Sequence, residues 1–423
     1  MSRGAGVRRR HGGVTGFVRR LLRRALLTVL GAQLTVIAAL TGIDAWRKRV
    51  RPQSAQFPRT KPRSSVIGAS TVTTFTYGED LYEAMLAAIR GARELVLFET
   101  FMWKSDAVGQ EFKDELVRAA ERGVEVYVIY DAWANLVVPS AFKRFPDSLH
   151  VLEYPVFPAG WRFYDLRRAG RDHRKILVVD GEDGFVGGYN IGSMYATQWR
   201  DTHVRIEGSS AWDLQNAFVD FWNLRRTPEL PALVDRGTSQ WEARIRVHRN
   251  VPRSWVFPIR GMYLEAIDRA QHHIYLTQAY FIPDDDFLRS LLAAARRGVD
   301  VRILMPEVSN HVVADWLSRG FYATLLRNGV RLMLYRDAMV HAKTGTIDGQ
   351  WTTIGTANID RISLTGNYEV NVEFYDSDLA EQMQRVFETD CSNARELTLR
   401  AWERRHVAAK FSESVLAPLR PLL

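Results

Sequence analysis

The chain has a single cysteine, Cys391, among its 423 residues. One thiol can form neither an intrachain disulfide nor a cysteine-based zinc site. Stability must therefore come from apolar packing, and hydrophobic residues make up 46% of the sequence. That share, over a length typical of about two to three domains, excludes a disordered or collagen-like chain.

Acidic residues are almost missing from residues 1–63, which hold 15 Lys and Arg but only one acid, Asp44. The formal net charge of this tail is +14, whereas the remaining 360 residues carry 42 basic and 47 acidic side chains, a net of −5. The basic character belongs to the tail and not to the body. A nucleic-acid-binding surface spread over the body is therefore disfavoured, although a local basic cleft is not.

Charge is absent from residues 25–43, ALLTVLGAQLTVIAALTGI. A helix of this length spans about 28 Å, close to the hydrocarbon thickness of a bilayer. A buried core helix is one alternative, but such helices rarely carry basic clusters at both ends. A cleaved signal peptide is another, but its cleavage site would be poor here. We predict a retained, single-pass N-terminal anchor in the cell membrane, whose orientation is not readable because both flanks are basic.

The body contains an internal repeat: three segments of its first half each have a similar segment, here called an echo, in its second half. In the best-preserved echo, a helix that ends at glycine leads into a β-branched strand. The echoes pair residues 118–131 with 293–306, 92–103 with 271–282, and 173–181 with 341–349. Strands that alternate with helices predict an α/β fold, with a mainly parallel or mixed sheet in each half.

Two copies are too few for a solenoid and predict a pseudo-twofold pair of domains with a shared site at their interface. We place the first domain at residues 64–235 and the second at 236–423. Residues 52–63, with three prolines, are expected to form an extended linker to the anchor.

The third echo holds a duplicated motif, His173-x-Lys175-x4-Asp180 and His341-x-Lys343-x4-Asp348. Alternate strand residues point the same way, so each His and Lys project into one space. The same offset of 168 residues relates Asn190 to Asn358 and Asp201 to Glu369. A single copy would indicate only a strand with incidental polar residues, but two copies at a constant offset are a strong functional signal.

These paired motifs resemble those of the phospholipase D superfamily. The similarity runs from about residue 70 to the C-terminus and is strongest to bacterial cardiolipin synthases, in the stretches HRKILVVDGEDGFVGGYNIG, WRDTHVRIEG, AYFIPDDDF, GTANIDRIS and NYEVNVEFYD. Thr356 stands where the family usually has serine, so a hydroxyl is kept. The resemblance implies two phospholipase D-like α/β sandwich domains, with the active site at their interface.

The resemblance and the residue types imply the same mechanism. The two motif lysines neutralise a phosphodiester anion, and Asn190 and Asn358 donate hydrogen bonds to it. One histidine attacks phosphorus to form a phosphohistidine, and the other acts as acid and base on the two alcohols. By the family pattern His173 is the nucleophile and His341 the acid/base. No metal ion or other cofactor is expected.

The four paired acids fall into two groups. Asp201 and Glu369 each lie 28 residues beyond a motif histidine and are candidates for carboxylates that hold an imidazole by its Nδ1–H. Asp180 and Asp348, although part of the catalytic motif, are expected to fix strand-end turns more than to touch the substrate.

The favoured function is a membrane-anchored phosphatidyltransferase of the cardiolipin-synthase type, with phosphatidylglycerol as the expected acceptor and glycerol as the released product. A hydrolytic phospholipase D is the alternative, followed by a nucleic-acid phosphodiesterase and an inactive membrane scaffold. Phospholipids and the bilayer are the expected partners, nucleic acid is not, and the oligomeric state is open. Residues 154–168, rich in aromatics and arginines, form either a packed loop or an interfacial segment that admits a lipid headgroup.

Overall fold

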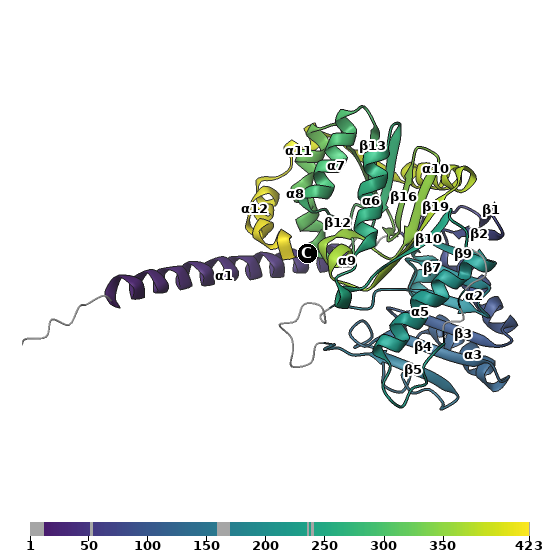
Figure 1. Ribbon diagram of the computed structural model, residues 1–423. Coiled ribbons are helices and arrows are strands. Elements are labelled where there is room, and N and C mark those ends of the chain that lie inside the picture. Colours follow the sequence, from purple (N-terminus) through teal and green to yellow (C-terminus); the bar gives the residue numbers. More distant parts are fainter. Residues whose placement is uncertain (1–11, 51–53, 159–169, 235–236, 238–240, 423) are drawn as a thin grey trace, which may run out of the picture.

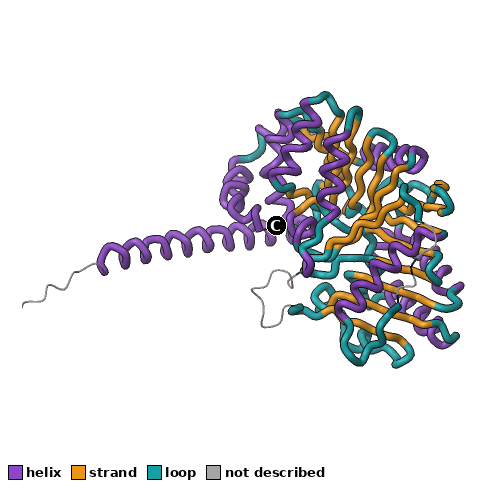
Figure 2. Tube along the Cα trace, viewed as in Figure 1, coloured by secondary structure: helices purple, strands orange, loops and turns teal. Residues whose placement is uncertain are grey.

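The computed structural model describes residues 12–50, 54–158, 170–234, 237 and 241–422. Two mixed sheets form the body, and helices cover them (Figures 1 and 2). The first sheet has the strand order β1 (Arg63–Ile67), β2 (Ser70–Phe75), β9 (His203–Glu207), β7 (Asp183–Gly187), β6 (Ile176–Val179), β3 (Leu95–Thr100), β4 (Glu125–Asp131) and β5 (Leu149–Tyr154). The second has the order β10 (Ile245–Asn250), β19 (Glu369–Tyr375), β17 (Trp351–Gly355), β16 (Lys343–Ile347), β11 (His273–Gln278), β13 (Asp300–Pro306), β14 (Arg331–Tyr335) and β20 (Ala394–Leu397).

The two sheets repeat one topology. In the first sheet β3, β4 and β5 run parallel to one another, and the strands from β6 to β2 are antiparallel. In the second sheet β11, β13 and β14 are parallel, and the strands from β16 to β10 are antiparallel. The prediction of two related α/β halves is therefore confirmed. The predicted domain boundary at residues 235 and 236 falls outside the described residues and stays a prediction.

Helices pack on both faces of each sheet, and the three largest apolar cores of the described residues lie beneath them. The outer core of the first half lies under α2 (Gly78–Gly91), α3 (Ala107–Glu121) and α4 (Ser193–Thr197). That of the second half lies under α6 (Pro258–Arg269), α7 (Asp285–Arg296) and α8 (Val312–Arg327). Between the sheets, α5 (Trp212–Arg225) and α10 (Ser377–Ser392) share one core with the inner faces of both sheets. This shared core makes the two halves a single packed body.

The glycine caps predicted from the first echo are present. Gly123 follows α3 with φ 90°, and Gly298 follows α7 with φ 93°. Both angles lie in the left-handed region that L side chains rarely adopt, which is why glycine ends the helix there. At the other ends, the carboxylates of Asp106 and Asp284 accept a backbone N–H in the first turn of their helices.

The N-terminal helix α1 (Gly12–Val50) is longer than the predicted span and includes it. Its segment Phe17–Val50 contains a window of mean hydropathy 2.0 that is 6% buried, so by length and composition it is apolar enough to cross a membrane. Residues 54–62 form neither helix nor strand, and the backbone N–H of Ala55 donates to the carbonyl of Asp337. This stretch of the predicted linker is thus tied to the second half.

Asp180 and Asp348 end β6 and β16 at tight turns. Both aspartates and the glycines after them have positive φ, between 51° and 73°, as a type I′ turn requires. The Asp180 carboxylate accepts the backbone N–H groups of residues 93–95, each at 2.9 Å. The Asp348 carboxylate accepts those of residues 271–273 at 2.7, 2.9 and 2.8 Å. Each aspartate therefore fastens a hairpin to the start of the neighbouring strand.

We expect Asp180→Ala to lower the free energy of unfolding by about 2–4 kcal/mol, because three N–H groups lose a charged acceptor. Turnover per folded molecule should persist, since Asp180 and Lys175 lie at opposite ends of β6, about 16 Å apart along the strand. Thermal unfolding and specific activity measure the two effects. The exposed loop residue Asp147 provides the control, and Asp147→Ala should change stability by less than about 0.5 kcal/mol. Lost turnover in Asp180→Ala at unchanged stability would contradict this role.

Candidate active site

Two short backbone contacts between the halves place the motif histidines. Strand β8 (Trp199–Arg200) of the first half pairs in parallel with β15 (Met339–Val340) of the second, and His341 N donates to Arg200 O at 2.7 Å. On the other side, an isolated bridge joins residues 172 and 368, and His173 N donates to Tyr368 O at 3.0 Å. Each histidine is thus held beside the residue that precedes an acid of the opposite half.

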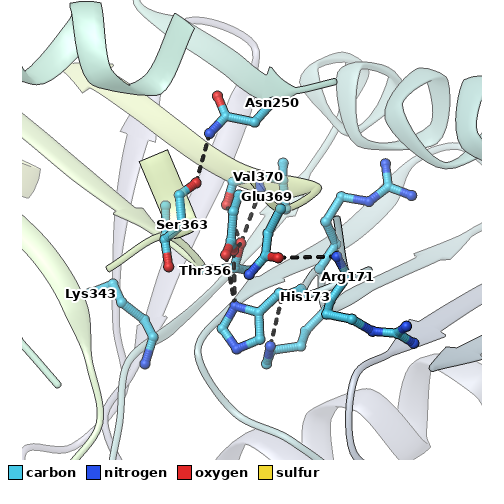
Figure 3. Close-up of polar contacts among 12 residues, drawn as sticks. Arg171, His173, Asn250, Lys343, Thr356, Ser363, Glu369 and Val370 are labelled. Atoms are coloured by element: carbon cyan, nitrogen blue, oxygen red, sulfur yellow. Dashed lines mark hydrogen bonds and ion pairs between the residues drawn. The ribbon is translucent and has the colours of Figure 1, made fainter. Parts of the chain in front are cut away.

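The histidine and acid side chains also pair between the two halves. His341 Nδ1 lies 2.6 Å from Asp201 Oδ2. His173 Nδ1 lies 2.9 Å from Glu369 Oε2, and Figure 3 shows this second pair. Each acid therefore contacts the histidine of the other half, not the one 28 residues before it. With Nδ1–H donated to a carboxylate, each imidazole leaves Nε2 free to react. Both pairs are buried, with both carboxylates at most 2% exposed.

Thr356 orients Glu369. Its hydroxyl donates to Glu369 Oε2 at 2.5 Å and accepts the backbone N–H of Val370 at 2.9 Å. Figure 3 shows Glu369 between this hydroxyl and the His173 ring. The threonine found in place of the family's usual serine thus keeps a hydroxyl that positions the acid.

The motif lysines are buried beside the histidines. Lys175 Nζ donates to His173 O at 2.7 Å, and Lys343 Nζ donates to His341 O. Burial lowers the pKa of Lys175 to about 7 and that of Lys343 to about 8, although nearby acids oppose the shift. A phosphodiester anion entering the site favours the charged form of each lysine, because opposite charges stabilise one another.

Both imidazoles are neutral near pH 7 in the empty site. Burial lowers the pKa of His173 well below its ordinary value, and the two lysine charges lower it further. Burial also lowers the pKa of His341, to about 3, with Lys343 adding to the shift. A neutral imidazole is the form that can attack phosphorus.

The two acids differ in charge. Burial raises the pKa of Glu369 to about 8, even though Lys175 and the Thr356 hydroxyl lower it. Burial also raises the pKa of Asp201, but the charge and hydrogen bond of His341, together with Lys343, outweigh it and leave that pKa below its ordinary value. Asp201 is therefore ionised near pH 7, and the negative charge of Glu369 is less favoured than that of Asp201.

Aromatic rings that the sequence did not single out complete the site. The Phe101 ring lies 4.7 Å from the His173 ring, and the Tyr280 ring lies 6.4 Å from the His341 ring. These two residues occupy the same position of the echo between 92–103 and 271–282, so the repeat contained a signal for both. Trp199, two residues before Asp201, lies 5.0 Å from the His341 ring.

The other expected site residues lie as follows. Asn190 and Asn358 are buried, and Asn190 Oδ1 accepts the backbone N–H of Met102 at 3.2 Å. Asn358 Oδ1 has no hydrogen-bond partner among the described residues. Asp180 and Asp348 stay at their strand-end turns, away from the paired histidines. Most of the expected interfacial segment, residues 159–168, lies outside the described part of the chain.

The family of the chain is evident from its relatives. A family model described as "Cardiolipin synthase, PLD-like domain" matches residues 85–222 and 263–391. A cardiolipin synthase of Staphylococcus aureus is 33% identical over 360 residues, which cover 82% of this chain and 73% of that protein. A cardiolipin synthase of Listeria monocytogenes is 30% identical over 366 residues, which cover 83% of this chain and 75% of that protein.

A solved structure shows the same fold. The crystal structure of phosphatidylserine synthase from Haemophilus influenzae aligns with a TM-score of 0.64 at 15% identity, covering 89% of this chain and 96% of that one. The chain belongs to the cardiolipin synthase family with phospholipase D-like domains, and it is an enzyme of this type, a phosphatidyltransferase. The resemblance drawn from the sequence is thereby confirmed.

We expect Asp201→Asn and Glu369→Gln each to reduce kcat by at least about a hundredfold, because the amide no longer fixes the tautomer of the opposite histidine. KM and melting temperature should change little. Steady-state kinetics and thermal unfolding of both variants provide the measurement.

Glu373→Gln is the matched control. Glu373 lies on β19, the strand of Glu369, and is also buried, but its carboxylate contacts Trp351 and His248 and neither motif histidine. Its kcat should stay near that of the unaltered enzyme. Near-normal kcat in both acid variants would refute the orienting role, and a large fall in their melting temperatures would indicate a structural one.

Proposed function

We propose that this enzyme joins two phospholipids: it transfers the phosphatidyl group of one phosphatidylglycerol to a hydroxyl of a second, forming cardiolipin and releasing glycerol. The observation that carries this proposal is the pair of motif histidines, each held by a buried carboxylate of the other half beside two buried lysines. The relatives named cardiolipin synthase support the choice of substrates.

In the first step, His173 Nε2 forms a bond to phosphorus and the bond from phosphorus to the glycerol oxygen breaks. His341, which takes up a proton on Nε2 when the phosphodiester anion binds beside it, gives this proton to the oxygen, and glycerol leaves. In the second step, His341 takes the proton of the acceptor hydroxyl, whose oxygen bonds to phosphorus while the P–N bond breaks. The lysine ammonium groups oppose the phosphoryl charge throughout, so the reaction needs no metal ion.

The unequal acids favour His173 as the nucleophile. His341 contacts an ionised Asp201, which stabilises the imidazolium that His341 must be when it acts as the acid and that it becomes again when it acts as the base. His173 contacts Glu369, whose raised pKa gives less support to a positive imidazole. His173 is therefore better suited to stay neutral and attack, and His341 to carry the proton.

The helix α1 anchors the enzyme in the cell membrane in this proposal. Its uncharged stretch matches the bilayer in length, and basic clusters flank it on both sides. An enzyme with two lipid substrates gains from such an anchor, because the anchor keeps the site beside the lipid surface. Phospholipids and the bilayer are then its partners.

The product distribution tests this function. Full-length enzyme in vesicles of phosphatidylglycerol, assayed with excess chelator, should yield cardiolipin and glycerol in equal amounts, separated by chromatography. Phosphatidic acid as the main product would identify a hydrolytic phospholipase D, for which water is the acceptor. Loss of activity in chelator that one metal ion restores would refute the metal-free mechanism.

The two histidines should differ in trapping experiments. With a substrate that has an activated leaving group, His341→Ala should still accumulate a labelled phosphohistidine, because the nucleophile is intact and needs less acid assistance. His173→Ala should accumulate none. Label trapped in His173→Ala but not in His341→Ala would reverse the assignment.

A further inference from the structure

One stripe of α1 packs against the catalytic body. The stripe runs along a single helical face at intervals of three and four residues, and it consists of Gln33, Val36, Ile37, Leu40, Asp44 and Lys48. Gln33, the only glutamine of the uncharged stretch, is 4% exposed and donates to Val415 O at 3.3 Å. Residues on the other faces stay exposed, with Leu34 at 68% and Trp46 at 63%. The helix is therefore docked on the body along its second half.

The docked stretch overlaps the membrane span. Residues 33–40 belong to the uncharged run 25–43, and Gln33 lies about 12 Å from one end of that run and about 15 Å from the other. If this run crosses the hydrocarbon, whatever touches Gln33 cannot lie wholly in water. Residues 17–32 of α1, which precede Gln33, are exposed.

The elements that touch this stretch are α8 and, near the C-terminus, α12 (Val407–Leu416). The short 3-10 helix η4 (Ala417–Leu422) follows α12 and contributes Leu419 to the same apolar cluster. Leu317 of α8 and Leu416 of α12 are buried against α1, with Leu419 of η4 packed beside them. Figure 1 shows α12 beside the body-side end of α1 and apart from the two sheets.

The outer face of α12 is apolar where it meets no protein. Val407 is 75% exposed and Phe411 is 63% exposed. Lys410 is the one charged residue on this face among the described residues of α12, and its long chain can extend its ammonium group toward the headgroups. The carboxylate of Glu413, the other charged residue of α12, forms an ion pair with Arg405, with 2.6 Å between Oε2 and Nη2, so the two charges neutralise one another.

We propose that α12 and η4 are seated in the bilayer against α1, with the outer face of α12 in contact with lipid acyl chains. The proposal rests on α1 being the membrane anchor of the proposed function, and it makes the C-terminal end a second membrane element. The depth of the Gln33 contact and the exposed apolar residues of α12, a helix that packs on α1, carry it.

This seating places the active site at headgroup level. Five residues beyond the uncharged run, about 7.5 Å along the helix, Lys48 Nζ donates to Ser309 O at 3.2 Å, in the loop before α8. Asn310 of the same loop accepts the Tyr280 hydroxyl at 2.6 Å, and the Tyr280 ring faces His341. The phosphodiester of a lipid in the bilayer then needs little vertical movement to reach the histidines.

Single-cysteine labelling tests the seating. With Cys391→Ser as background, Phe411→Cys carries an environment-sensitive fluorophore in the full-length enzyme, reconstituted in phosphatidylglycerol and phosphatidylethanolamine vesicles. Quenchers attached to the acyl chains should reduce its fluorescence at least about twofold, since the face lies within the acyl boundary. Iodide in the water should have little effect.

Two further positions make every outcome decisive. Leu34→Cys, exposed on α1, reports whether the anchor crosses the bilayer at all, and Val66→Cys, 71% exposed on β1, reports the body. Acyl-chain quenching at 34 and 411 but not at 66 supports the proposal. Quenching at 34 alone overturns the seating and leaves the anchor and the proposed function intact. No quenching at 34, or equal quenching at 66 and 411, also overturns it. Cardiolipin formation by each labelled variant shows separately that the enzyme is folded and active.

Discussion

The exchange of histidines and carboxylates between the halves is the contact on which the rest of the site depends. His173 needs Glu369, and His341 needs Asp201, so neither half holds a complete catalytic pair. The backbone bonds from His173 to Tyr368 and from His341 to Arg200 fix the two chains next to these pairs. The two motif strands, one from each half, thereby contribute to one site with two histidine–carboxylate pairs.

The charged side chains buried near the two histidines are held by further ion pairs in a packed core. Arg200 of the first half pairs with Asp390 of α10 at 2.7 Å, and both side chains are about 2% exposed. Near the other histidine, Arg171 binds Asp131 at 2.6 Å. Removing one partner of such a pair would leave a buried charge unpaired, at a cost of about 3–5 kcal/mol. The core shared by α5, α10 and both sheets keeps these pairs in register.

The docking of α1 links the apolar N-terminal helix, the proposed membrane anchor, to this rigid body. A flexible tether would hold the enzyme near lipid without orienting it. Here Gln33 and Lys48 bond to the C-terminal helix and to the loop before α8, so α1 and the body have a defined relation. Asn310 of that loop accepts the hydroxyl of Tyr280, whose ring faces His341. A chain of contacts therefore connects α1 to one of the two motif histidines.

Local patterns in the sequence were enough to determine much of this protein. The apolar run of α1, the glycine caps at Gly123 and Gly298, the Asp-Gly turns and the duplicated H-x-K motif each depend on neighbouring residues, and a repeat makes them visible twice. The exchange between His173 and Glu369 was decided by the tertiary structure alone. Both acids lie 28 residues beyond a histidine, and spacing along one half is the same whichever histidine the acid contacts. The docking of Gln33 on Val415 likewise joins residues 382 positions apart. Such contacts arise only when two sheets and a helix that lie far apart in the sequence pack together, because packing, and not chain order, sets which surfaces meet.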